Sequence, residues 1–221
     1  VHLPATSVSL RGTASDSDGI KTRVWTQLTP SFAQIESPSS LNTVVSNLSA
    51  GLYKFLLTVT DFHDGSNSDS VTVRVNIPPV ANAGPNIVVH APLNQALIAG
   101  SITDTDGSAT PIWTQVGTTP STATIQSPSN DSTIVSNLIP GIYTFELTAS
   151  DNDGATHISS VSVKVNLPPV VNAGADQTFS VSAGEISLVG TVTESDGSAS
   201  SIWTQTSGPC SAIFGTASSP I

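Results

Sequence analysis

The chain has no methionine and a single cysteine, and only six of its 221 residues are lysine or arginine. A lone cysteine cannot form an internal disulfide, so we expect Cys210 to be a small buried or half-buried residue. Six basic residues against sixteen acidic ones give a net charge of −10. This charge excludes nucleic acid as a partner, because the phosphates would not be neutralised.

Long apolar runs are also missing. No run approaches the roughly 18 apolar residues that a bilayer-spanning helix needs, so direct membrane insertion is not expected. Helical spacing of apolar residues is absent as well. Short runs of alternating polarity are instead separated by clusters of glycine, proline, asparagine and aspartate, which is typical of an all-β sandwich.

The sequence repeats itself. Trp25, Trp113 and Trp203 are each followed by Thr-Gln and stand 88 residues (113 − 25) and 90 residues (203 − 113) apart. Such a period fits a whole small domain. We therefore predict a first domain over 1–76 with a truncated N-terminal strand, a complete domain over 77–166, and the N-terminal part of a third over 167–221. We expect the chain to be a window on a longer array.

The middle copy shows its strands most clearly. Apolar side chains alternate with polar ones between Tyr143 and Ala149 and again between Val161 and Val165, which predicts two half-buried strands. Shorter strands are predicted at 87–89, around Ala96 and Ile98, around Trp113 and at 133–138. A tryptophan on the third strand and a tyrosine just after a glycine are typical of immunoglobulin-type sandwiches.

Four motifs follow one another in this order. They are Pro-Pro-x-x-Asn-Ala-Gly from Pro78, Asp-x-Asp-Gly from Asp104, Trp-Thr-Gln at Trp113 and Leu-x-x-Gly-x-Tyr-x-Phe from Leu138. In this combination the chain resembles the polycystic kidney disease (PKD)-like repeats. The resemblance implies tandem immunoglobulin-like β-sandwich domains in an extended rod. It also implies an extracellular or cell-surface setting, often in large secreted bacterial proteins.

The favoured function is a non-catalytic spacer or stalk of a cell-surface adhesin or filament. Pro78-Pro79 and Pro168-Pro169 restrict each joint, since proline fixes φ and extends the residue before it. The expected partners are neighbouring PKD-like domains of the same chain, with other surface proteins or glycans. The alternative is an accessory glycan- or protein-binding module of a secreted polysaccharide-degrading enzyme.

Ten of the sixteen acidic residues fall in two types of loop that an immunoglobulin-like topology brings to one end of each domain. Carboxylate, amide and carbonyl oxygens are the ligands that calcium prefers. The predicted calcium ligands are Asp104, Asp106, Asp151, Asp153 and Asn82, with Asp16, Asp18, Asp61 and Asp64 as the equivalent set in the first domain. The loop at Asp61–Gly65 is expected to hold one extra residue relative to 151–154.

Two interpretations of these loops stay open. Asp-x-Asp-Gly is also ordinary turn chemistry, in which the aspartate caps its own backbone and the glycine supplies a positive φ. Turn chemistry explains each loop singly, whereas calcium would also explain why both lie at one end. No catalytic constellation is predicted, because serines and acids that recur in every copy are structural by default and no convergent pocket is implied.

Overall fold

The computed structural model describes residues 1–29, 32–180, 184–215 and 218–220. Every regular element in these residues is a β-strand, which confirms the all-β prediction. No helix in the described ranges has the length and apolar character needed to cross a bilayer. The predicted domains are called the first, second and third repeats below.

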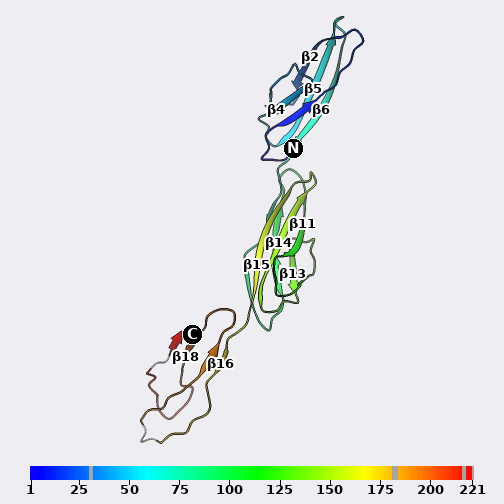
Figure 1. Ribbon diagram of the computed structural model, residues 1–221. Coiled ribbons are helices and arrows are strands. Elements are labelled where there is room, and N and C mark those ends of the chain that lie inside the picture. The colour runs from blue at the N-terminus through cyan, green and yellow to red at the C-terminus, as the bar shows by residue number, and fades with distance from the viewer. Residues whose placement is uncertain (30–31, 181–183, 216–217, 221) are drawn as a thin grey trace. The chain divides into compact units, whose positions relative to one another are not determined.

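The first repeat is a sandwich of two sheets (Figure 1). One sheet has the order β1-β4-β3, formed by Val8–Arg11, Asn42–Ser46 and Gln34–Ile35. The other has the order β2-β5-β6, formed by Ile20–Gln27, Gly51–Asp61 and Ser66–Val75. Trp25, Tyr53 and Phe55 are buried between them.

The second repeat has the same plan. Its sheets have the orders β12-β13-β9 and β11-β14-β15-β8, and β8 runs parallel to β15. The parallel bridge between His2 and Asn76 is the counterpart of this pairing in the first repeat. A short pair is formed by β7 with β10. The strands are β7 Val80–Asn82, β8 Ile87–His90, β9 Ala96–Ala99, β10 Ser101–Thr103, β11 Ala109–Val116, β12 Thr124–Ile125, β13 Ser132–Ser136, β14 Gly141–Asp151 and β15 Thr156–Asn166.

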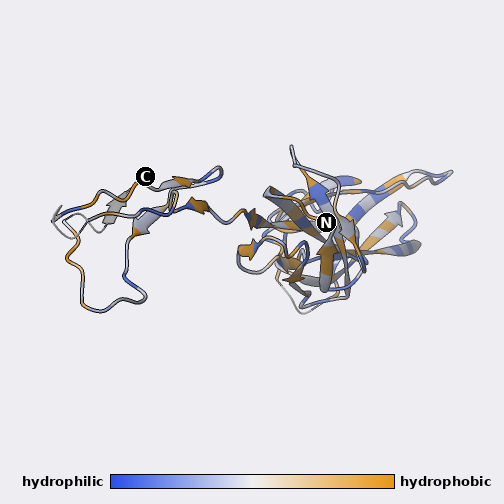
Figure 2. Cartoon of the chain, turned by 90° about the horizontal axis from the view of Figure 1, so that it is seen from below, coloured by the Kyte–Doolittle hydropathy of each residue, from blue (hydrophilic) through white to orange (hydrophobic). Residues whose placement is uncertain are grey.

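The predicted core of the second repeat is confirmed. The four alternate β14 residues from Tyr143 to Ala149 have no exposed surface, and Trp113 is 2% exposed. The tyrosine corner is present, since the Tyr143 hydroxyl accepts a hydrogen bond from Ile139 N (2.9 Å). The alternation of apolar and polar residues along the strands is visible in Figure 2.

In the third repeat, the described residues form two small sheets, and much apolar surface stays uncovered. Strand β16 (Val170–Asn172) pairs with β17 (Thr191–Thr193), and β18 (Ser200–Ile202) pairs with β19 (Ser218–Pro220). Ile213 is 98% exposed. Cys210 is exposed too, so its predicted burial is wrong, because no closed core forms around it in the described part of this repeat.

The glycine of the motif Asn-Ala-Gly is required for steric reasons. Gly84 has a φ of +81°, and a Cβ built there would stand 2.4 Å from the carbonyl oxygen of Ala99. Gly174 repeats this geometry against the carbonyl oxygen of Val189, again at 2.4 Å, with a φ of +87°. Only glycine tolerates both the conformation and the approach, so the entering chain can pass close to the backbone of Ala99 in the second repeat and of Val189 in the third.

The compact units do not coincide with the repeats. One unit contains 1–82, 100–112 and 147–159, and the other contains 83–99, 113–146 and 160–221. The first unit therefore contains the whole first repeat together with both acidic loops of the second repeat. The repeat boundaries at 76/77 and 166/167 stay predictions.

Candidate functional site: the acidic joint

The acidic loops of the second repeat begin with self-capped turns. Asp104 Oδ1 accepts a hydrogen bond from Asp106 N (3.2 Å). Asp151 Oδ1 accepts hydrogen bonds from the backbone N of Asp153 (2.9 Å) and of Ala155 (2.8 Å). Turn chemistry thus accounts for the first aspartate of each loop. It leaves the second carboxylate of each loop, Asp106 and Asp153, available to other groups.

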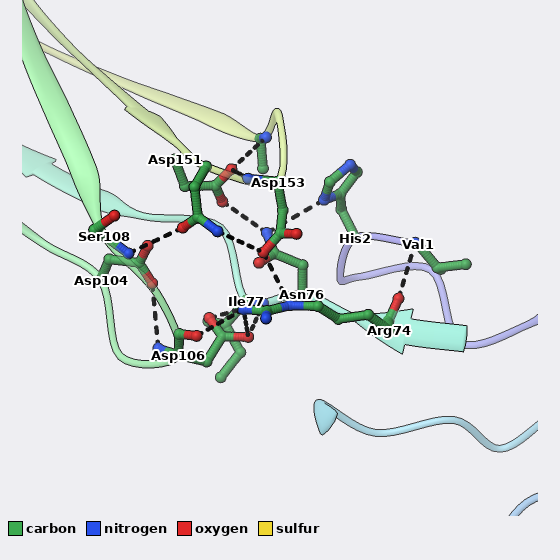
Figure 3. Close-up of polar contacts among 12 residues, drawn as sticks. Val1, His2, Arg74, Asn76, Ile77, Asp104, Asp106, Ser108, Asp151 and Asp153 are labelled. Carbon is green, nitrogen blue, oxygen red and sulfur yellow. Dashed lines mark hydrogen bonds and ion pairs between the residues drawn. The ribbon is translucent and has the colours of Figure 1, made fainter. Parts of the chain in front are cut away.

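Arg74, the penultimate residue of β6, contacts both second carboxylates (Figure 3). Its Nε lies 2.9 Å from Asp153 Oδ2, and its Nη2 donates to the carbonyl oxygen of Asp106 at 2.7 Å. The same nitrogen lies 3.8 Å from Asp106 Oδ2. One planar guanidinium can serve several acceptors in fixed geometry, so Arg74 ties the last strand of the first repeat to two loops of the second.

Asn76 and Ile77 add uncharged contacts next to this ion pair. The Asn76 side chain is 2% exposed, and its Nδ2 donates to Asp151 Oδ2 at 2.7 Å. The backbone N of Ile77 donates to Asp106 Oδ2 at 3.2 Å. Together these residues make a contact set that we call the acidic joint: Arg74, Asn76, Ile77, Asp106, Asp151 and Asp153.

Hydrogen bonds determine the charge state of Asp151. Burial raises the pKa of this carboxyl, but the Asn76 amide and the backbone N–H groups of Ala155, Asp153 and Gly154 together outweigh burial and lower the pKa below its usual value of 3.8. Asp151 is therefore ionised at neutral pH and acts as an acceptor in the joint.

The contact set recurs 90 residues later, within the second compact unit. Lys164 Nζ donates to the carbonyl oxygen of Asp196 at 3.0 Å and lies 3.8 Å from Asp196 Oδ1. The backbone N of Leu167 donates to Asp196 Oδ2 at 2.8 Å. This N–H is the main reason that the pKa of Asp196 is lowered, and Glu194 and Lys164 act in the same direction. Lys164, Leu167 and Asp196 thus repeat the roles of Arg74, Ile77 and Asp106.

Of the five predicted calcium ligands, Asp106 and Asp153 contact Arg74. Asp151 joins this group through Asn76, and Asp104 joins it through the backbone N of Asp106. Asn82 is elsewhere, on β7 and opposite Ser101 of β10. Within the described ranges, no three His, Cys, Asp or Glu side chains are grouped so that they could hold a metal ion. Asp104 Oδ2 is a buried atom without a hydrogen-bond partner, which would suit a cation, but Asp106 and Asp153 already face the guanidinium. These residues do not fit a calcium cage well, and the calcium site stays a prediction.

Of the equivalent acids of the first repeat, Asp16, Asp18 and Asp64 are exposed, and Asp61 is half-buried at the end of β5. Asp16 Oδ1 accepts from Asp18 N (2.8 Å), as in the second repeat. Lys21 Nζ lies 2.5 Å from Asp64 Oδ1, and His63 Nδ1 lies 3.9 Å from Asp18 Oδ2. Unlike Asp104 and Asp106, which are half-buried, Asp16 and Asp18 are open to solvent.

The prediction of an extra residue in the loop at Asp61 is wrong. Asp61 Oδ1 accepts from the backbone N of His63 (2.7 Å) and of Gly65 (2.9 Å), which matches the two bonds of Asp151 Oδ1. Asp64 has a φ of +65° where Gly154 has +91°. Asp64 therefore takes the place of a glycine, and His63, rather than Asp64, corresponds to Asp153.

Sequence reasoning missed the basic partners of the joint. Arg74 and Lys164 occupy the same place in Val-Arg-Val-Asn and Val-Lys-Val-Asn, and the chain has only six basic residues. The recurrence of a basic residue at this one place could have identified these partners from the sequence. The acids suggested a cation, and the positive charge beside them comes from the preceding strand.

The chain matches the protein family described as K319L-like, PKD domain, over residues 1–75 and 83–165. It is 34% identical over 176 residues to the mouse dyslexia-associated protein KIAA0319-like protein, covering 76% of this chain and 17% of that protein. It is 32% identical over 193 residues to the human dyslexia-associated protein KIAA0319, covering 83% and 18%. The chain thus spans less than a fifth of the length of these curated relatives.

Among solved structures, extracellular domains 3–5 of Drosophila OTK align with a TM-score of 0.55. They are 12% identical, over 75% of this chain and 58% of that one, which shows a shared fold. The predicted bacterial source is not confirmed, because the curated relatives reported above are mammalian proteins.

Proposed function

Because the chain belongs to the K319L-like PKD domain family, we propose that it is a non-catalytic spacer of an extracellular or cell-surface protein. In this proposal, the acidic joint holds each repeat to the next and limits their relative motion. The supporting observation is the recurrence of the contact set, first with Arg74 on Asp106 and then with Lys164 on Asp196.

Three features of the joint favour stiffness. The backbone N–H of the first residue of a repeat, Ile77 or Leu167, is bonded to a carboxylate in an acidic loop of that repeat. The two prolines that follow each of them lack N–H groups and restrict the backbone. A short pair, β7 with β10 or β16 with β17, then fixes the entering chain. No Gly/Ser-rich segment of the kind that makes a loose tether lies between.

The binding-module alternative stays a prediction. Phe32 and Phe62 are exposed, with 77% and 63% of their surfaces accessible, but they stand at non-equivalent positions of one repeat. A glycan-binding array would be expected to repeat its aromatic platform from one copy to the next.

The proposal is tested by the freedom of motion between the first two repeats. Fluorophores on exposed residues of each repeat would report a distance distribution in single-molecule energy transfer. We expect the distribution to broaden in Arg74→Glu, because reversed charge repels Asp106 and Asp153. Lys54→Glu, an equal charge change at an exposed position of β5, is the matched control. Equal widths in both variants and the wild type would refute the proposed joint.

A further inference from the structure

The short strand that follows the acidic joint is held by a histidine side chain. Strand β7 comes directly after Pro78-Pro79, and the backbone N of Ala81, its middle residue, donates to His157 Nδ1 at 3.0 Å. His157 is the second residue of β15. Both residues lie in the same compact unit as the acidic joint. This hydrogen bond therefore ties the chain that enters the second repeat to one of its core strands.

The bond requires a neutral imidazole ring. A backbone N–H can only donate, so His157 Nδ1 must accept, and the ring proton must sit on Nε2. Protonation would place an N–H on Nδ1 as well, facing the N–H of Ala81. Ala81 is 5% exposed, so water does not readily replace the lost acceptor. Protonating His157 would thus leave a buried donor unsatisfied and favour release of β7.

Solvent protons reach this ring, because His157 is exposed. Histidine is the side chain that ordinarily changes its charge between about pH 5 and 8, an interval that includes both extracellular and endosomal conditions. The same interval lies above the range in which Asp151 is protonated, since the pKa of that carboxyl is lowered below 3.8. A response of His157 can therefore be separated from the acid response of the carboxylates.

No ion pair compensates for the lost bond. The carboxylates on the strands and loops around His157 are those of Glu146, Asp151, Asp153, Asp104 and Asp106. In the part of the chain that the structure describes, none of them lies within 4.0 Å of a His157 ring nitrogen. Arg74 and Asn76 already engage three of these acids. The other charged or titratable residues near β15, Lys164 and His90, lie toward its far end.

The bond also completes the hold on the chain between the repeats. Ile77 is fixed by its N–H bond to Asp106 at 3.2 Å, and Ala81 is fixed by His157. The segment that contains both prolines is therefore held on each side. Release of Ala81 would leave it held at Ile77 and by the short pairing of β7 with β10.

The first repeat has a non-titrating acceptor at the corresponding place. Asn67 stands six residues after Asp61, as His157 stands six residues after Asp151, once the loops are matched without an insertion. An asparagine Oδ1 lies at about the same distance from the backbone as a histidine Nδ1 and accepts at every pH. His157→Asn is therefore a substitution that the repeat already uses, and it removes the titration while keeping an acceptor.

We propose that His157 makes the joint sensitive to pH. The neutral ring holds β7 and keeps the joint stiff at extracellular pH, and protonation at endosomal pH releases β7 and lets the two repeats move more freely. The inference rests on the proposed joint, because it adds a regulating contact to that contact set.

The test compares the whole chain at about pH 7.5 and about pH 5.5. Amide hydrogen exchange followed by NMR should give Ala81 a protection factor that is roughly tenfold lower at the acidic pH, after correction for intrinsic exchange. The distance distribution between fluorophores on the first two repeats should broaden over the same interval. His157→Asn should abolish both responses. His90→Asn, the same change at another exposed histidine, should retain them.

Three results would overturn the proposal: an Ala81 protection factor that is equal at both pH values in the wild type, a pH response that persists in His157→Asn, or a loss of protection without any change in the distance distribution. The second result would assign the response to another histidine such as His2, whose Nδ1 lies 3.2 Å from Asn76 Nδ2. The melting temperature of His157→Asn at neutral pH shows whether that variant stays folded, and the wild-type measurements do not depend on it. If the wild type ignores pH while Arg74→Glu still broadens the distribution, the pH response is refuted and the joint is retained.

Discussion

At the residue scale, the joint depends on one basic side chain per repeat. Arg74 is 41% exposed and Asp153 is 26% exposed, so water weakens their attraction. Arg74 nevertheless makes a charge-assisted bond to each of two loops, which a lysine point charge cannot reproduce in the same geometry. Arg74→Lys should therefore destabilise the first joint less than Arg74→Ala does, and both variants should be less stable than the wild type.

We predict that Arg74→Ala lowers the free energy of unfolding by about 1–2 kcal/mol, the scale of two partly exposed charge-assisted hydrogen bonds. Arg74→Lys should lose roughly half of this amount, by the same reasoning. Urea denaturation measures both. Lys54→Ala serves as the control for removing an exposed cation from a strand, and a loss from Arg74→Ala no larger than from this control would contradict the assignment.

The acid response follows from the lowered pKa of Asp151. A carboxyl whose pKa is lower in the folded state contributes stability above its unfolded pKa, and that contribution disappears as the pH falls through the folded value. The wild type should therefore lose stability as the pH falls below the usual value of 3.8. Asp151→Asn should be less stable at pH 7 and show a shallower loss in acid. Parallel pH profiles of melting temperature for the two proteins would show that Asp151 does not carry this effect.

At the scale of elements, the close approach at Asn-Ala-Gly gives a steric prediction. Gly84→Ala places a Cβ against the Ala99 carbonyl in a left-handed conformation. We expect a loss of about 1–3 kcal/mol in the free energy of unfolding. A Cβ at Gly197 would meet no atom within 4 Å, so Gly197→Ala should change stability by less than about 0.5 kcal/mol. Similar losses of stability from both substitutions would show that the close approach to the Ala99 carbonyl does not require glycine at position 84.

The strands were predictable because their signals are local. Alternation from Tyr143 to Ala149 and the repeated tryptophan placed the core correctly, since period 2 determines which side chains face inward. The match between His63 and Asp153 was not predictable, because letter-by-letter alignment of Asp and Gly hides that Asp64 adopts the glycine conformation. Likewise, the pairing of Arg74 with Asp106 depends on contacts between residues 32 positions apart.

At the scale of the whole molecule, a bound calcium ion and the Arg74 guanidinium lead to different expectations for the melting temperature. A resident calcium ion bound only by the folded state would raise the melting temperature by mass action. Because Arg74 already faces Asp106 and Asp153, we expect the melting temperature to be the same in excess calcium and in excess chelator. Magnesium at equal ionic strength controls for screening. A rise specific to calcium would instead support the predicted metal site.

The most direct test of the joint is a double-mutant cycle between Arg74 and Asp153, whose side chains meet at 2.9 Å. Arg74→Ala, Asp153→Asn and the double variant would be compared with the wild type by urea unfolding. If the guanidinium holds the loop of the next repeat, the double variant should lose less stability than the sum of the two single losses, by about 0.5–1 kcal/mol. Additive losses would contradict the account, because the two side chains would then act independently.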